Sequence, residues 1–153
     1  MTLKRSVASV LILAGAVFVL YWYFPVPPAS QGQGIMPTDT LILAGTSVRV
    51  AIADTEALRE HGLSGYSGLA PDEGMLFVFP SDGTYSFWMK DMLFSIDMLW
   101  MDAQGRVVDI EKAVSPDTFP QAFTPDSPSR YVLEVSAGFS DKHTIVVGSK
   151  VEW

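Results

Sequence analysis

Hydrophobic residues run almost unbroken near the start of the chain and recur in short groups from there to its end. Residues 7–24 carry no charged side chain, and this span of 18 residues is just long enough to cross the hydrocarbon core of a bilayer as a helix. Lys4 and Arg5 precede the span, and no acidic residue occurs before Asp39. The positive-inside tendency therefore predicts a transmembrane anchor at 7–24, with residues 1–6 in the cytoplasm and the rest of the chain outside the membrane.

A cleaved signal peptide has a similar charged start and apolar middle, and it would give a secreted protein instead. The best candidate cleavage site is Pro-Pro-Ala-Ser at 27–30, which places a proline where a small residue is expected. Four aromatic residues at 21–24 suit the aromatic belt of a membrane interface. These features favour an uncleaved anchor, followed by a linker rich in proline, glycine and serine at 25–38.

Beyond Asp39 the pattern changes to short apolar or alternating runs, which are typical of β-strands. One helix is expected, with Asp54 as its N-cap and Gly62 as its C-terminal stop. The proline-rich stretch 115–128 is expected to be a loop. We predict strands at 40–44, 48–53, 75–79, 85–89, 96–102, 106–113, 130–136, 143–147 and 149–152. The expected fold class of residues 39–153 is mainly β (α+β), a compact antiparallel β sandwich or barrel-like domain with one short helix, preceded by a single transmembrane helix.

The composition excludes several functional classes but does not identify the function. The chain is 48% hydrophobic and 18% charged with a net charge of −7, so it offers no basic surface for a nucleic acid. It has no cysteine and only two histidines, which excludes disulfides and thiolate sites and argues against a metal site; no cofactor is expected. No phosphate loop, dinucleotide fingerprint or serine triad is recognisable. A domain of this size can fold alone, and we expect it to be monomeric.

Three charged residues stand in apolar company, where a charge must be paired or must shift its protonation. Lys90 follows an aromatic pair that includes Trp88, Asp97 opens an apolar strand, and Glu134 sits within another. In one interpretation Trp88, Lys90, Asp97 and Glu134 converge on a pocket. In the other, which we favour, Lys90 and Asp97 form a structural ion pair and Glu134 faces solvent.

Two pairs of methionines three residues apart, 89 with 92 and 98 with 101, raise the further possibility of a Cu(I) site of soft thioethers. On a strand, however, residues three apart point to opposite faces, and methionine is a common core residue. The pattern therefore predicts core packing rather than copper binding.

The order of several segments resembles a known family. The segments are Gly-Met-Leu-Phe-Val-Phe at 74–79, Phe-Trp-Met-Lys at 87–90 and Val-Leu-Glu at 132–134. Together they resemble the domain of unknown function 192, or uncharacterised protein family 0127, over about residues 40–153. The resemblance implies a small, mostly β domain, often placed behind a membrane helix, with no established reaction. The chain departs from the family pattern at Ser64, Tyr66, Asp91 and Met92.

These observations lead to one functional expectation with two alternatives. We expect a membrane-anchored, extracytoplasmic accessory domain that binds a small ligand or an envelope protein partner. The first alternative is a small enzyme that uses Lys90, Asp97 and Glu134 at an apolar pocket. The second is a purely structural envelope protein. The positions of the three charged side chains distinguish these hypotheses. Side chains that share one open site favour binding or catalysis, and side chains that lie apart favour the structural role.

Overall fold

A computed structural model describes residues 38–153, and the predicted membrane segment and most of the predicted linker lie outside the described residues. Within 38–153, no helix combines the length and the apolar character that crossing a membrane requires. The structure therefore covers the β-rich domain that the sequence predicts from residue 39 onward.

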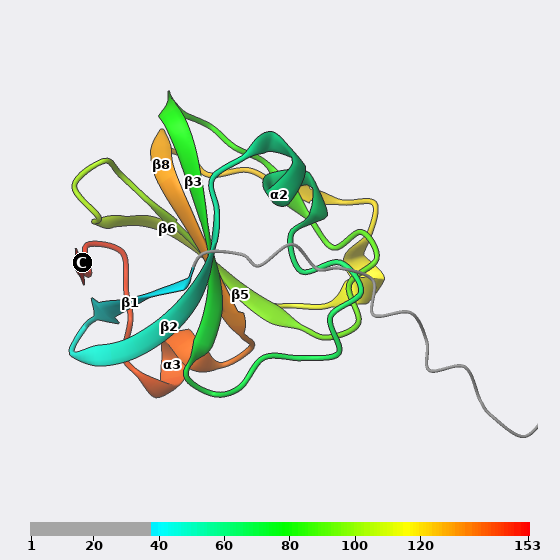
Figure 1. Ribbon diagram of the computed structural model, residues 1–153, viewed down its shortest axis with the longest axis horizontal. Coiled ribbons are helices and arrows are strands. Elements are labelled where there is room, and N and C mark those ends of the chain that lie inside the picture. The colour runs from blue at the N-terminus through cyan, green and yellow to red at the C-terminus, as the bar shows by residue number, and fades with distance from the viewer. Residues whose placement is uncertain (1–37) are drawn as a thin grey trace, which may run out of the picture. The chain divides into compact units, whose positions relative to one another are not determined.

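Seven strands form one strongly curled sheet, a half-barrel that wraps around its own core (Figure 1). Their order across the sheet is β6-β5-β8-β3-β2-β1-β9, and β4 pairs with β7 as a separate two-stranded ribbon. The strands are β1 (Thr38–Leu43), β2 (Thr46–Ala53), β3 (Glu73–Gly83), β4 (Phe87–Trp88), β5 (Ile96–Met101), β6 (Val107–Val114), β7 (Ala122–Phe123), β8 (Ser129–Ser136) and β9 (Val151–Glu152). The prediction of a mainly β domain is confirmed.

The prediction of an all-antiparallel sandwich or barrel is wrong in one respect. Strands β2 and β3 pair in parallel, while the other pairs of the large sheet are antiparallel. Parallel neighbours need a long crossover, and residues 54–72, which include the helix α2 (Glu56–His61), provide it. The result is a single mixed sheet rather than two sheets packed face to face.

Helix α2 begins and ends close to the predicted limits. Its N-cap is Thr55 rather than Asp54, because the Thr55 hydroxyl accepts the hydrogen bond from the Leu58 amide. Gly62 ends the helix with φ 51°, a left-handed value that favours glycine.

Two other local predictions are corrected. Residues 143–147 are not a strand, because the chain forms the short helix α3 (Phe139–Lys142) and then turns. The loop predicted at 115–128 contains the 3-10 turn η1 (Pro116–Thr118) and strand β7. The predicted hairpin of 96–102 with 106–113 is confirmed as β5 and β6.

The two faces of the curled sheet bury two different apolar clusters. Alternation along each strand assigns residues to one face or the other, as on β8, where Leu133 and Val135 join one cluster and Val132 joins the other. Helix α3 covers the first face through Phe139. Helix α2 and the loop after it cover the second face, to which Leu63 contributes.

Candidate functional site

The second face of the sheet opens to solvent at a cleft of about 910 Å³ beside α2. Helix α2 forms one wall, and the aromatic segment from β3 to β4 forms the other. Glu134 of β8 also lines the cleft. The aromatic side chains in the lining are Phe77, Phe79, Tyr85, Phe87 and Trp88, and the charged ones are Glu56, Arg59, Glu60, Lys90, Asp91 and Glu134.

Glu134 occupies the centre of the sheet. It stands in register with Met75 of β3 on one side and Met98 of β5 on the other. Its residue surface is only 4% exposed, which corrects the prediction of a solvent-facing glutamate. Burial raises the pKa of Glu134 from 4.5 to about 8, because the apolar surroundings disfavour the charged carboxylate.

No hydrogen bond or ion pair from residues 38–153 compensates this carboxyl group, and desolvation is the sole cause of its raised pKa. Thioether neighbours such as Met75 and Met98 have no hydrogen to donate. At neutral pH the group is therefore predominantly protonated, and it can donate a hydrogen bond into the cleft.

Gly74 fixes the close approach of β3 to β8 beside Glu134. A Cβ atom at position 74 would lie 2.8 Å from the backbone oxygen of Glu134 and 3.1 Å from a methyl carbon of Val135. Only glycine avoids this overlap with a backbone atom, so the family-like Gly-Met-Leu-Phe segment contributes to the position of the buried carboxyl group.

The other wall of the cleft is a continuous aromatic cluster. The rings of Phe77 and Phe87 meet edge to face with centroids 4.8 Å apart, and Phe79 stacks on Tyr85 at 3.6 Å. Trp88 lies further out, 55% exposed, with its ring 5.9 Å from that of Phe119. Such packing gives a rigid apolar wall, in which Phe77 is buried, Phe79 is covered by Tyr85, and the ring of Trp88 is the most exposed.

Arg59 of α2 already places one cation against this wall. Its guanidinium lies 5.3 Å from the centre of the Phe79 ring. The same group donates hydrogen bonds to the backbone oxygens of Asp54, at 2.6 Å, and Val78, at 2.8 Å. Arg59 is thus a fixed part of the wall that ties α2 to β3.

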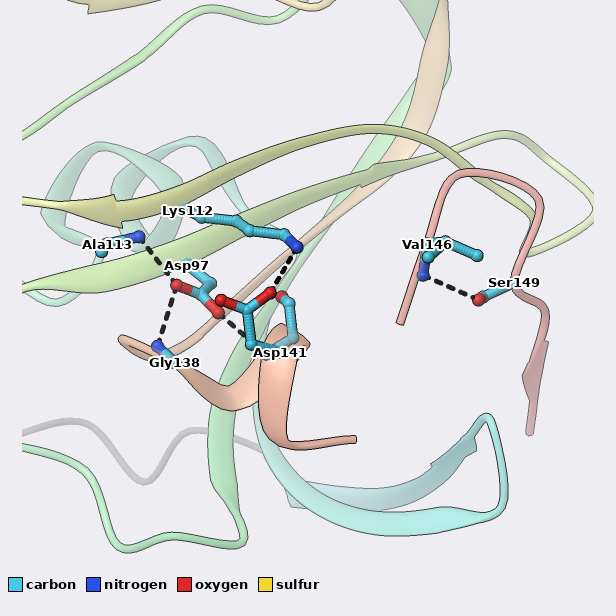
Figure 2. A network of polar contacts seen from close by, with 8 residues as sticks. Asp97, Lys112, Ala113, Gly138, Asp141, Val146 and Ser149 are labelled. Atoms are coloured by element: carbon cyan, nitrogen blue, oxygen red, sulfur yellow. Dashed lines mark hydrogen bonds and ion pairs between the residues drawn. The ribbon is translucent and has the colours of Figure 1, made fainter. Parts of the chain in front are cut away.

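Asp97, the remaining predicted site residue, does not lie in the cleft. It is fully buried on the opposite face of the sheet, where its carboxylate accepts three backbone N–H bonds: from Ala113 at 2.8 Å, Gly138 at 3.1 Å and Ser140 at 2.8 Å (Figure 2). Ala113 has a φ of 51°, at the irregular register between β5 and β6. Asp97 therefore holds this irregular backbone to the start of α3.

The predicted ion pair between Lys90 and Asp97 is not formed, although both residues are within the described part of the chain. Lys90 is exposed at the cleft, while the Asp97 carboxylate is occupied by backbone amides on the other face. The structure thus brings Trp88, Lys90 and Glu134 to one cleft and separates Asp97 from them.

The sequence interpretation did not include the contribution of α2 or of the aromatic residues before β4. A recognisable signal was the spacing of Phe77 and Phe79, because residues two apart on one strand share a face, and Tyr85 with Phe87 repeats this spacing after the turn. The contribution of α2 depends on how the crossover folds back over the sheet, which is a tertiary property.

Three of the four departures from the family pattern lie at this cleft: Ser64, Asp91 and Met92. The Ser64 hydroxyl donates to the backbone oxygen of Lys90 at 3.1 Å, and the Gly65 amide donates to that of Asp91 at 3.0 Å. The loop after α2 therefore supports the loop after β4 at the edge of the cleft.

Met98 and Met101 are divided as alternation predicts, since they lie in different apolar clusters, whereas Met89 and Met92 lie in the same cluster because they flank a turn and not a strand. In residues 38–153 no three His, Asp or Glu side chains gather closely enough to hold a metal ion. Met92 lines the cleft, whereas Met75, Met89 and Met98 pack in the cluster beneath it.

Comparisons with known proteins agree with the resemblance read from the sequence. The family model DUF192, described as uncharacterized ACR, matches residues 39–153. The chain is similar to a UPF0127 protein of Thermococcus sibiricus, 32% identical over 109 residues that cover 69% of this chain and 66% of that protein. A UPF0127 protein of Thermococcus gammatolerans is 31% identical over 106 residues, covering 68% of this chain and 65% of that protein. The match thus spans about two thirds of the length of these relatives.

The fold is also similar to that of a solved structure. A crystal structure of a protein of unknown function from Novosphingobium aromaticivorans superposes with a TM-score of 0.73 and 26% identity, covering 84% of this chain and 91% of that one. The described domain therefore has the architecture of a known, independently solved protein.

Proposed function

The chain belongs to DUF192, a family of uncharacterised proteins, and we propose that it acts as a membrane-anchored, extracytoplasmic domain that binds a small molecule in the cleft beside α2. The observation that carries the proposal is the buried carboxyl group of Glu134, which has no ion-pair partner among residues 38–153 and lines an open cleft of about 910 Å³. Ligand sites are typically concave, mostly apolar, of about 300–1,000 Å³, and equipped with a few polar groups.

Desolvation of a buried carboxyl group costs stability, and no hydrogen bond or ion pair within residues 38–153 offsets this cost at Glu134. Asp97 provides the comparison, since its buried carboxylate is satisfied by three backbone amides and has an evident structural task. A ligand that forms a hydrogen bond or an ion pair with Glu134 would offset this cost. The aromatic wall supports the same location.

The proposed location outside the membrane rests on the sequence. The uncharged span 7–24 and the preceding Lys4 and Arg5 support an anchor with the domain outside. The enzyme alternative is less favoured, because Asp97 lies on the other face of the sheet and leaves only Lys90 and Glu134 at the cleft.

A neutral aromatic probe tests whether the cleft accepts a small molecule. We expect 2-phenylethanol to shift the methyl resonance of Met92, which lines the cleft, in the full chain labelled at its methionine methyl groups. The resonance of Met101, on the opposite face of the sheet, serves as the internal control and should not move.

A blocking variant locates the binding. Ala57 is exposed on α2 and lines the cleft, so Ala57→Trp should fill the opening and abolish the Met92 shift. Val147→Trp, at an exposed residue that does not line the cleft, is the matched control and should leave the shift intact. Equal shifts in both variants, or no shift of Met92 in the unaltered chain, would refute a ligand site in this cleft.

A further inference from the structure

The chemistry of the cleft also points to the class of its ligand. Resting on the proposed function of this cleft, we infer that its ligand is an organic ammonium ion, a cationic nitrogen on an apolar body, held between the Glu134 carboxylate and the aromatic wall. The inference goes beyond ligand binding as such, because a neutral or anionic ligand would satisfy that proposal equally well.

The first step concerns what Glu134 lacks. Its cross-strand neighbours are Met75 and Met98, which cannot donate a hydrogen bond. Of the two Lys and Arg residues that line the cleft, Arg59 is committed to the backbone oxygens of Asp54 and Val78, and Lys90 is exposed to solvent. A cation that enters from solvent would therefore provide Glu134 with the counterion that residues 38–153 do not supply.

The second step concerns the aromatic wall. An ammonium group is attracted to the negative face of an aromatic ring within about 6 Å, and several rings together form the usual site for such cations. The guanidinium of Arg59 at 5.3 Å from the Phe79 ring shows that this wall already accepts a cation on one ring. Phe77, Phe87 and Trp88 extend the same wall along the cleft.

The third step concerns charge around the opening. Apart from Glu134, which is mostly protonated at neutral pH, the cleft carries three acidic residues, Glu56, Glu60 and Asp91, against the cationic groups of Arg59 and Lys90. The whole chain has a net charge of −7. The surrounding potential therefore favours the approach of a cation and opposes that of an anion.

The fourth step concerns the coupling between ligand binding and the protonation of Glu134. Because burial raises the pKa of Glu134 to about 8, the empty site is mostly protonated below that pH. An ammonium ion binds the ionised form, so its binding releases one proton from Glu134 to solvent. Its affinity should rise about tenfold per pH unit below about pH 7 and level off above about pH 8, whereas the affinity of a neutral ligand should not rise.

Three probes with one apolar body separate the possibilities: 2-phenylethylamine, 2-phenylethanol and phenylacetate, titrated against the full chain and followed at the Met92 methyl resonance. We expect the amine to bind at least tenfold more tightly than the alcohol at pH 8, and phenylacetate to bind most weakly. Glu134→Gln should bring the amine down to the level of the alcohol without weakening the alcohol. Glu152→Gln, at an exposed residue that does not line the cleft, is the matched control and should keep the amine preference.

A second variant tests the contribution of the aromatic wall and leaves the carboxyl group of Glu134 unchanged. Trp88→Leu changes a half-exposed residue, so folding should be preserved, and the amine preference should fall about two- to fivefold. An alcohol that binds as tightly as the amine, or an amine preference that survives Glu134→Gln, would overturn the ammonium inference while ligand binding itself stands. If none of the three probes moves Met92, the proposed function fails as well.

Discussion

At the scale of single residues, two buried carboxyl groups of one small domain have opposite environments. Asp97 accepts three hydrogen bonds from backbone amides, and Glu134 lies at a cleft with no ion-pair partner among the residues that the structure describes. Both are nearly inaccessible, so burial alone does not distinguish a structural acid from a binding acid. The difference lies in which face of the sheet each residue occupies.

The raised pKa of Glu134 predicts a specific dependence of stability on pH. In the unfolded chain the group ionises near pH 4.5, whereas in the folded protein it stays protonated to about pH 8. The folded state binds the extra proton between these values, so the free energy of unfolding should fall by about 1.4 kcal/mol per pH unit, on the order of 5 kcal/mol in all. Above about pH 8 this loss should be complete.

Urea melts between pH 4.5 and 9 measure this effect. Glu134→Gln should remove the contribution of the group, so the difference between wild type and variant should change with pH across that window. Glu60→Gln should follow the wild-type curve. Wild-type and Glu134→Gln curves that run parallel would contradict the raised pKa.

Asp97→Asn should destabilise the fold without affecting the cleft. One amide NH2 replaces an accepting oxygen and faces backbone donors, so at least one of the bonds from Ala113, Gly138 and Ser140 is lost. We expect a loss of about 3 kcal/mol in urea melts. Asp91→Asn, at an exposed loop residue, should cost less than about 0.5 kcal/mol. Similar losses in the two variants would rule out a structural role specific to Asp97.

Two tryptophans should respond very differently to truncation. Trp100 is fully buried, and its indole N–H donates to the backbone oxygen of Tyr85 at 2.8 Å. Trp100→Ala should therefore cost about 3–5 kcal/mol. Trp88 is 55% exposed, so Trp88→Ala should cost about 1 kcal/mol or less, as measured by chemical denaturation. A large loss for Trp88→Ala would mean that its ring supports the core instead of walling an open cleft.

At the scale of elements, the parallel pair of β2 and β3 creates the cleft. Because these neighbours run in the same direction, residues 54–72 must return over one face of the sheet, and α2 is laid beside β3 as a wall. A hairpin at this point would have left Glu134 and the aromatic segment without a second wall.

The contact between β3 and β8 depends on Gly74. Gly74→Ala would place a Cβ atom 2.8 Å from the Glu134 backbone oxygen, so we expect a loss of about 2–3 kcal/mol by thermal or urea unfolding. Gly45→Ala is the comparison, because no atom lies within 4 Å and only the left-handed φ of 80° opposes the change. It should cost about 1 kcal/mol. A Gly74→Ala loss no larger than this would mean that the two strands separate easily.

At the scale of the whole molecule, the expected topology is directly testable. If residues 7–24 form an anchor with residues 1–6 in the cytoplasm, protease added to spheroplasts should digest or release the domain that follows, while an N-terminal tag stays protected. Full protection of the domain in intact spheroplasts, with digestion after lysis, would reverse the orientation. A domain found free of the membrane would favour signal cleavage.

Much of the fold follows from the sequence alone. Alternation along 130–136, the hairpin of 96–102 with 106–113 and the glycine stop of the helix depend on neighbours within a few residues, and each is confirmed. The short helix at 139–142 was missed, since its four residues carry too little local pattern, and its start is held by the distant Asp97 carboxylate.

The sequence by itself determined the mainly β class, the family-like segments and the fact that Lys90, Asp97 and Glu134 are charges in apolar surroundings. Only the tertiary structure decided that Glu134 and Lys90 meet at one cleft while Asp97 serves the opposite face. The physical reason is that alternation tells which residues of one strand share a face, but not which strands become neighbours or which face a distant helix covers. Those are settled by the parallel pairing of β2 with β3 and by the packing of α2 and α3 on opposite sides of the sheet.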